Sequence, residues 1–175
     1  MNTKRTRLTC AFFAGIIFMA GCGISEKPFP SSTQGANDPP PTNYFVDAES
    51  FEQQLNTFRR VEGLRTLERN PKLDNAAYFH AQDMTRRRFF SHVSTDGPNG
   101  NILPERVMSQ GCLPTRVAEN LAVGHRTETE VFELWLASPA HKRALLGAAF
   151  KTYGVARVNR VWVLVLASGC SQKTG

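Results

Sequence analysis

Apolar residues in the first half of the chain recur at helical spacing. Three of them predict a helix over about residues 47–61. They are Phe51, Leu55 and Phe58. Asn70 followed by Pro71 marks a second helix to about residue 88, because asparagine caps a first turn and proline fits its first position. His80 lies on the apolar stripe of that helix, so its simplest interpretation is a core histidine with one hydrogen-bond partner.

Capping residues mark further helices in the second half. A short helix is expected over about residues 103–110. Thr127 is followed three residues later by Glu130, and this capping box begins a longer helix. Ser138 and Pro139 open another helical turn, and an N-cap role would occupy the Ser138 hydroxyl.

The last apolar pattern has the character of strands. Residues 153–158 and 161–167 are rich in valine and leucine and are separated by Asn159 and Arg160, which predicts a hairpin. The second run is almost wholly apolar, so that strand should be covered on both faces. We therefore expect an α+β fold with helices on each side of a small sheet.

The start of the chain has the composition of a targeting signal. A basic stretch precedes an apolar run over residues 8–20, which is shorter than the roughly 20 apolar residues that a membrane-spanning helix needs. The run ends in Met19-Ala20-Gly21-Cys22, which looks like a bacterial lipobox, in which the cysteine is acylated. An ordinary secretory signal with an incidental cysteine is the alternative.

Residues after the signal are rich in proline, serine, asparagine and glycine, which is typical of a tether. We expect a lipoprotein signal over 1–21, a disordered tether over 22–46, one folded domain over 47–170 and a tail over 171–175. Acyl chains on Cys22 would hold the protein at a membrane. By resemblance to lipoprotein sorting in Gram-negative bacteria, the glycine after Cys22 favours the outer membrane.

Charge argues against a nucleic-acid partner. The formal net charge is +6, but Lys4, Arg5 and Arg7 belong to the predicted signal. The remaining sequence has no basic stripe with interleaved aromatic residues of the kind that binds single strands.

Two cysteines remain once Cys10 leaves with the signal and Cys22 is lipidated. Cys112 and Cys170 are an even pair in an oxidising compartment, which predicts a disulfide between them. Two buried or free thiols are the alternative.

Seven segments, taken in order, carry a family resemblance across about residues 50–168. They are Leu55–Arg59, Asn70–Leu73, His80–Met84, Phe90–His92, Ala118–Ala122, Trp135–His141 and Tyr153–Val155. No single segment is specific, but together they resemble the bacterial branch of the CAP superfamily, also called SCP-like. The resemblance implies a three-layer α-β-α sandwich with a small antiparallel sheet.

The resemblance also implies a cleft that carries two histidines and two glutamates. His92, Glu119 and His141 match three of these positions. Ser138 stands where the family has its second glutamate, so the set is incomplete. Glu105, on the short helix after the loop, is a candidate to approach the cleft instead, with a solvated surface carboxylate as the alternative.

Metal binding is one role for this set, with zinc as the candidate metal and no cofactor strictly required. His92 and His141 are the expected ligands, with Glu119 as a third candidate. If Glu119 instead orients one imidazole, only two ligands remain. A third alternative is that Glu119 only holds the histidines together as a scaffold.

Hydrolysis is a second role, either metal-dependent or by a nucleophile. Ser91 or Ser138 could be grouped with His141 and Glu119, but no nucleophile-elbow motif is present. We therefore favour a third role, a binding module in the cell envelope rather than an enzyme. Its expected ligand is a lipid, a peptidoglycan fragment or an envelope protein.

Overall fold

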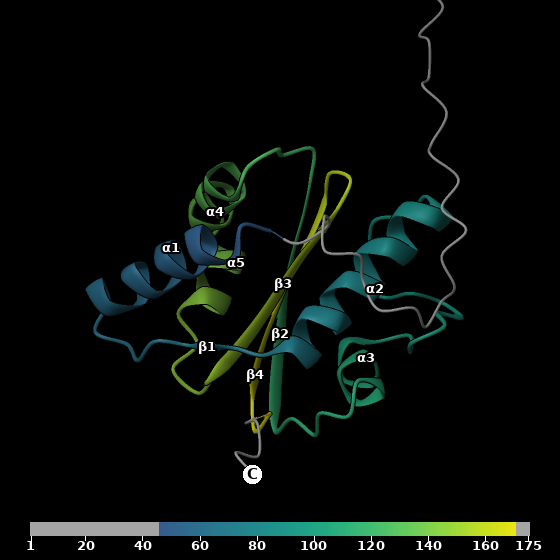
Figure 1. The fold of residues 1–175 in the computed structure, drawn as a ribbon, viewed down its shortest axis with the longest axis horizontal. Coiled ribbons are helices and arrows are strands. Elements are labelled where there is room, and N and C mark those ends of the chain that lie inside the picture. Colours follow the sequence, from purple (N-terminus) through teal and green to yellow (C-terminus); the bar gives the residue numbers. More distant parts are fainter. Residues whose placement is uncertain (1–45, 171–175) are drawn as a thin grey trace, which may run out of the picture. The chain divides into compact units, whose positions relative to one another are not determined.

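The computed structural model describes residues 46–170 (Figure 1). The predicted signal, the predicted acylation site at Cys22, the predicted tail and all but the last residue of the predicted tether lie outside the described residues. That last residue, Val46, is 3% exposed and belongs to one of the two hydrophobic cores. No helix in the described range is both long and apolar enough to cross a membrane.

Five helices and four strands make up the described fold. In chain order they are α1 Ala48–Val61, β1 Glu68–Arg69, α2 Pro71–Arg87, α3 Leu103–Ser109, β2 Arg116–Val123, α4 Glu128–Ala137, α5 Pro139–Leu145, β3 Thr152–Val158 and β4 Val161–Ser168. All five predicted helical segments are confirmed, with ends shifted by one or two residues, as is the α+β class.

Side-chain caps begin three of the helices. The side chain of Asp47 accepts a hydrogen bond from the Ser50 amide at the start of α1, and Asn70 accepts one from Lys72 at the start of α2. The Thr127 hydroxyl accepts from the Glu130 amide at the start of α4. Ser138 does occupy the N-cap position of α5, but its hydroxyl makes no capping bond, so that part of the prediction is wrong.

The four strands form one sheet in the order β1-β3-β4-β2. The predicted hairpin is confirmed: β3 and β4 are antiparallel, Val158 pairs with Val161, and the turn is Asn159-Arg160. Asn159 has φ +55°, as a tight two-residue hairpin turn requires. The sheet is mixed rather than purely antiparallel, because the two residues of β1 pair in parallel with β3.

Helices cover the two faces of the sheet separately (Figure 1). α1, α4 and α5 lie on one side and α2 and α3 on the other. Side chains of β4 alternate between the two cores: Val163 and Val165 face α2 and α3, whereas Trp162 and Leu164 face α1 and α4. This confirms the expectation that the last strand is buried on both faces.

Backbone contact fixes α2 against β3. A Cβ atom added to Gly154 would lie 2.1 Å from the carbonyl carbon of Leu73 and 2.2 Å from the amide nitrogen of Asp74. No side chain fits there without movement of the backbone. The buried carboxylate of Asp74 also accepts a hydrogen bond from the Val155 amide at 2.9 Å. The first turn of α2 is therefore in direct contact with β3.

A disulfide joins Cys112, after α3, to Cys170, after β4, with 5.3 Å between the Cα atoms. The predicted pairing is confirmed. The side-chain amide of Asn70, the cap of α2, donates to the carbonyl of Cys170. One asparagine thus links the start of α2 to the disulfide-bonded end of the sheet.

Candidate functional site

The carboxylate of Glu119 is the centre of the candidate site. Glu119 lies on β2, an edge strand, and its side chain is only 3% exposed. Oε1 accepts a hydrogen bond from Nδ1 of His92 at 2.8 Å, and Oε2 accepts one from Nη2 of Arg106 at 2.9 Å. The buried negative charge is therefore held between an imidazole and a guanidinium.

Arg106, which the sequence analysis missed, is the counter-charge of this site. It lies on α3, and its side chain is 2% exposed. Besides Glu119, its guanidinium donates to the carbonyls of His92 and Asn101, each at 3.1 Å. Arg106 thus holds both ends of the loop that carries His92. The only sequence signal was indirect: a glutamate that is buried in a strand needs a positive partner.

His92 presents the other half of its ring to solvent. Its side chain is 59% exposed, and its Nδ1 is bound to Glu119, which leaves Nε2 as the nitrogen available to a ligand. The hydrogen bond to Glu119 raises the pKa of His92 above its ordinary value, although partial burial and the charge of Arg106 oppose the shift.

His141 approaches from the opposite layer, on α5. Its Nδ1 is buried and has no hydrogen-bond partner among the described residues. Burial lowers the pKa of His141, and the nearby positive charge of His92 lowers it further. The backbone carbonyl of His141 accepts a hydrogen bond from Nδ2 of Asn120 at 3.1 Å. Neighbouring residues on β2 therefore hold the two histidines: Glu119 holds the ring of His92, and Asn120 the backbone of His141.

His80 lies beneath the site on α2. It is 1% exposed, and its Nε2 is 3.0 Å from the carbonyl of Ser91 and 3.9 Å from Oε1 of Glu119. Burial lowers its pKa more than the charge of Glu119 raises it. The interpretation as a core histidine with one hydrogen-bond partner is confirmed.

The side chains of the other sequence candidates make no described hydrogen bond to Glu119, His92 or His141. Oε2 of the exposed Glu105 accepts from the Asn101 amide at 2.7 Å and closes the loop before α3. Ser138 is half-buried at the junction of α4 and α5. The hydroxyl of Ser91 accepts from the Val93 amide at 3.1 Å. No described hydrogen bond joins the hydroxyl of Ser91 or of Ser138 to a histidine ring, as a serine nucleophile would require.

Few side-chain atoms at the site are available to bind a metal ion. Both oxygens of Glu119 are engaged, so the available ligands are Nε2 of His92 and the ring of His141. Within residues 46–170 no group of three or more histidine, cysteine, aspartate or glutamate side chains is placed to hold a metal ion. The contact from Glu119 to His92 has the form of a carboxylate that orients a ligating imidazole. This set fits a weak site completed by water better than a closed structural zinc site.

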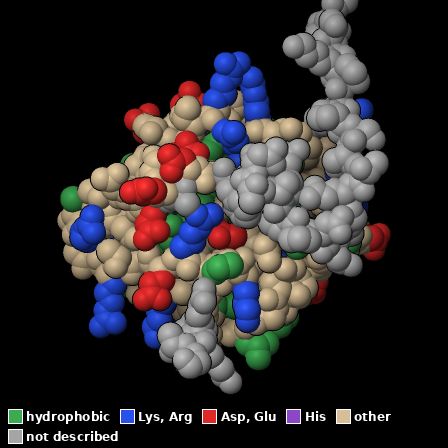
Figure 2. All heavy atoms as spheres, in the orientation of Figure 1, with side chains coloured by type: hydrophobic (Ala, Val, Ile, Leu, Met, Phe, Trp, Pro, Cys, Tyr) green, Lys and Arg blue, Asp and Glu red, His purple; other side chains and the backbone are tan. Residues whose placement is uncertain are grey.

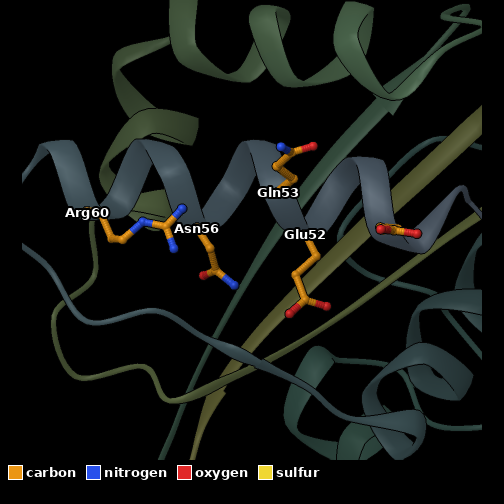
Figure 3. Close-up of a pocket in the computed structure, with 5 residues that line it drawn as sticks. Glu52, Gln53, Asn56 and Arg60 are labelled. Carbon is orange, nitrogen blue, oxygen red and sulfur yellow. The ribbon is translucent and has the colours of Figure 1, made fainter.

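A separate open groove runs along α1 (Figure 3). Its walls are polar, with Glu52 and Asn56 among the lining residues. The amide of Asn56 exchanges two hydrogen bonds with the backbone of Leu67, and Glu52 accepts from the hydroxyl of Tyr153 at 3.2 Å. These groups already hold α1 against its neighbours, so the groove is less suited to capture a ligand than the His92 site. On the face viewed in Figure 2, acidic and basic side chains are interspersed.

The profile of the cysteine-rich secretory protein family, CAP, matches residues 53–161. That match spans more than half of the chain. The chain belongs to the CAP family.

Bacterial relatives share this CAP domain. The chain is 25% identical over 134 residues to the uncharacterized protein YkwD of Bacillus subtilis, covering 77% of this chain and 51% of that protein. It superposes on an SCP-domain extracellular protein of Bacillus anthracis with TM-score 0.64 and 22% identity, covering 69% of this chain and 39% of the other. An outer surface protein of Borrelia burgdorferi gives TM-score 0.61 and 22% identity over 70% of this chain and 92% of its own. The chain thus spans about half the length of the curated relative.

Removal of the counter-charge should be costly. We expect Arg106→Met to lower the free energy of unfolding by about 3–5 kcal/mol at pH 7, because Glu119 would be left buried and unpaired. Arg60→Met, at an exposed position, should change it by about 0.5 kcal/mol or less. Urea denaturation measures both. Equal stability of the two variants would show that Glu119 does not need Arg106.

The pKa values of His92, His80 and His141 should be shifted in different directions from the ordinary value of histidine. By NMR, we expect His92 to titrate above 6.5, and His80 and His141 below it. The stability that His92 contributes is complete below pH 6.5 and is lost as the pH rises through its folded-state pKa. The stability that His80 and His141 contribute is complete above pH 6.5 and is lost as the pH falls through their folded-state pKa values. Glu119→Gln should lower the pKa of His92; an unchanged value would exclude Glu119 as the cause.

Proposed function

We propose that this CAP domain is a binding module of the cell envelope and that its ligand docks at the exposed edge of the His92–Glu119–His141 cluster. The arrangement at Glu119 carries this proposal. Its carboxylate is fully engaged in holding Arg106 and His92, which leaves a preorganised imidazole facing solvent, and within residues 46–170 no serine hydroxyl is hydrogen-bonded to it. Such a constellation supports recognition more directly than covalent catalysis.

Lipid is the ligand class that the surroundings favour. The loop around His92 exposes apolar side chains: Phe90 is 50%, Val93 51% and Ile102 44% exposed. A proton-bearing imidazole beside apolar side chains suits an amphiphile with a carboxylate or phosphate head group. Peptidoglycan fragments and envelope proteins are the other candidates that the experiment below separates.

Attachment at Cys22 would place the domain next to such ligands. A lipid-anchored protein of the outer membrane is the location that we propose, with the tether between the anchor and the domain. The disulfide suits an oxidising compartment, and the related proteins from Bacillus anthracis and Borrelia burgdorferi are described as extracellular and outer-surface proteins.

Vesicle co-sedimentation tests the ligand. In a Cys22→Ser background, which removes the anchor, the protein should bind vesicles that contain an anionic lipid and should lose that binding when His92→Gln and Phe90→Ser are combined. Val61→Ser removes an even more exposed apolar residue, at the end of α1, and should have no effect. Binding to isolated peptidoglycan but not to vesicles would show that peptidoglycan, and not lipid, is the ligand. Binding to neither would contradict the proposal of a binding module.

Zinc is the second candidate ligand. It would either bind without catalysis or serve as the metal of a metal-dependent hydrolase. The free Nε2 of His92 and the unpartnered Nδ1 of His141 favour it. The metal would act there as a Lewis acid. Calorimetry should give weak zinc binding that His92→Ala abolishes and Glu119→Gln weakens by about 10–100-fold. Equal affinity of wild type and His92→Ala would remove zinc from the site.

A further inference from the structure

A small void lies between α2, the loop before α3, and α3 itself. His80 and Asp83 line it from α2, residues 97–100 from the loop, and Arg106 from α3. It leaves about 10 Å³ for the centre of a water-sized sphere, which is room for one water molecule and little more.

Two unpartnered polar atoms belong to residues that line this void. Nδ1 of His80 and Nε of Arg106 are both buried, and neither has a hydrogen-bond partner among the described residues. Their residues are 1% and 2% exposed. All the other nitrogens of the two side chains are engaged: Nε2 of His80 with Ser91, and both Nη atoms of Arg106 with Asn101, His92 and Glu119. Buried polar atoms left in this state usually indicate a bound partner.

The chemistry of the two atoms is complementary. Nε2 of His80 faces a carbonyl and must carry the proton, so Nδ1 is an acceptor. Nε–H of Arg106 is a donor. An occupant must therefore both donate and accept, which excludes a bare anion or cation, and it must be no larger than the void.

We propose that one ordered water molecule occupies this void, donates to Nδ1 of His80 and accepts from Nε–H of Arg106. Asp83 also lines the void, and its carboxylate, which already accepts from Arg87 and Ser94, would be the acceptor for the second hydrogen. A buried water with three protein partners is ordinary in proteins of this size.

This water helps to hold the loop that carries His92 in place. His80 holds the carbonyl of Ser91, and Arg106 holds the carbonyl of His92 together with the carboxylate of Glu119. The water joins those two anchors, so the base of the His92 loop is fixed from both sides. The inference is independent of the ligand and of any metal.

A crystal structure at high resolution and NMR cross-relaxation with water test this inference on the wild-type protein. We expect density within about 3.2 Å of both atoms, and a cross-peak between Nε–H of Arg106 and a long-lived water. A void without density, or a direct hydrogen bond between Arg106 and His80, would overturn the inference without any variant.

Two substitutions at His80 separate the roles of its nitrogens. His80→Asn keeps an acceptor near the place of Nδ1 and should keep the cross-peak, whereas His80→Gln keeps only a group near Nε2 and should lose it. Thr85→Val is the control, because the Thr85 hydroxyl is also buried without a described partner but does not line the void. Loss of the cross-peak in Thr85→Val, or its persistence in His80→Gln, would contradict the assignment.

Discussion

Glu119 carries a carboxylate that is almost fully removed from water on an edge strand. A charge in that position is tolerated only with a close counter-charge and filled hydrogen bonds. Arg106 supplies the charge, and its remaining donors bind the backbone at His92 and Asn101. The requirement of one buried anion therefore fixes the position of α3 relative to β2 and the path of the loop between α2 and α3. The exposed imidazole of His92 is held in place as a consequence.

The edge position of β2 explains how histidines from both layers meet. Side chains of a strand alternate between faces, so Glu119 points toward α2 and α3 while Asn120 points toward α5. In the middle of a sheet these two faces would be separated by the next strand. At the edge, the loop before α3 and the start of α5 can approach around β2, and the charge of His92 reaches His141. A site built from two layers therefore requires an edge strand here.

Local signals made the helices and the hairpin predictable, because a helix cap or a tight turn depends on residues within about four positions of one another. Asn70-Pro71, Thr127 with Glu130, and Asn159-Arg160 are of this kind. β2 was not recognised as a strand, because its burial comes from helices on both sides and leaves no alternation to read. The parallel β1 is two residues long and exists only through its pairing with β3. Three residues of the cluster came from the family resemblance, whereas Arg106 lies in a short helix whose pattern does not show that it is buried.

Ser138 distinguishes this cluster from the set of two histidines and two glutamates that the family resemblance implies. The family resemblance implies a second glutamate at that position, where a carboxylate could accept a proton from the neighbouring histidine. A serine there makes no capping bond, and Nδ1 of His141 has no described partner. Burial and the charge of His92 lower the pKa of His141, whereas the hydrogen bond to Glu119 raises the pKa of His92. The raised pKa of His92 favours a hydrogen-bond donor there, and the lowered pKa of His141 favours an acceptor. A symmetric pair of histidine–glutamate contacts would not provide this combination.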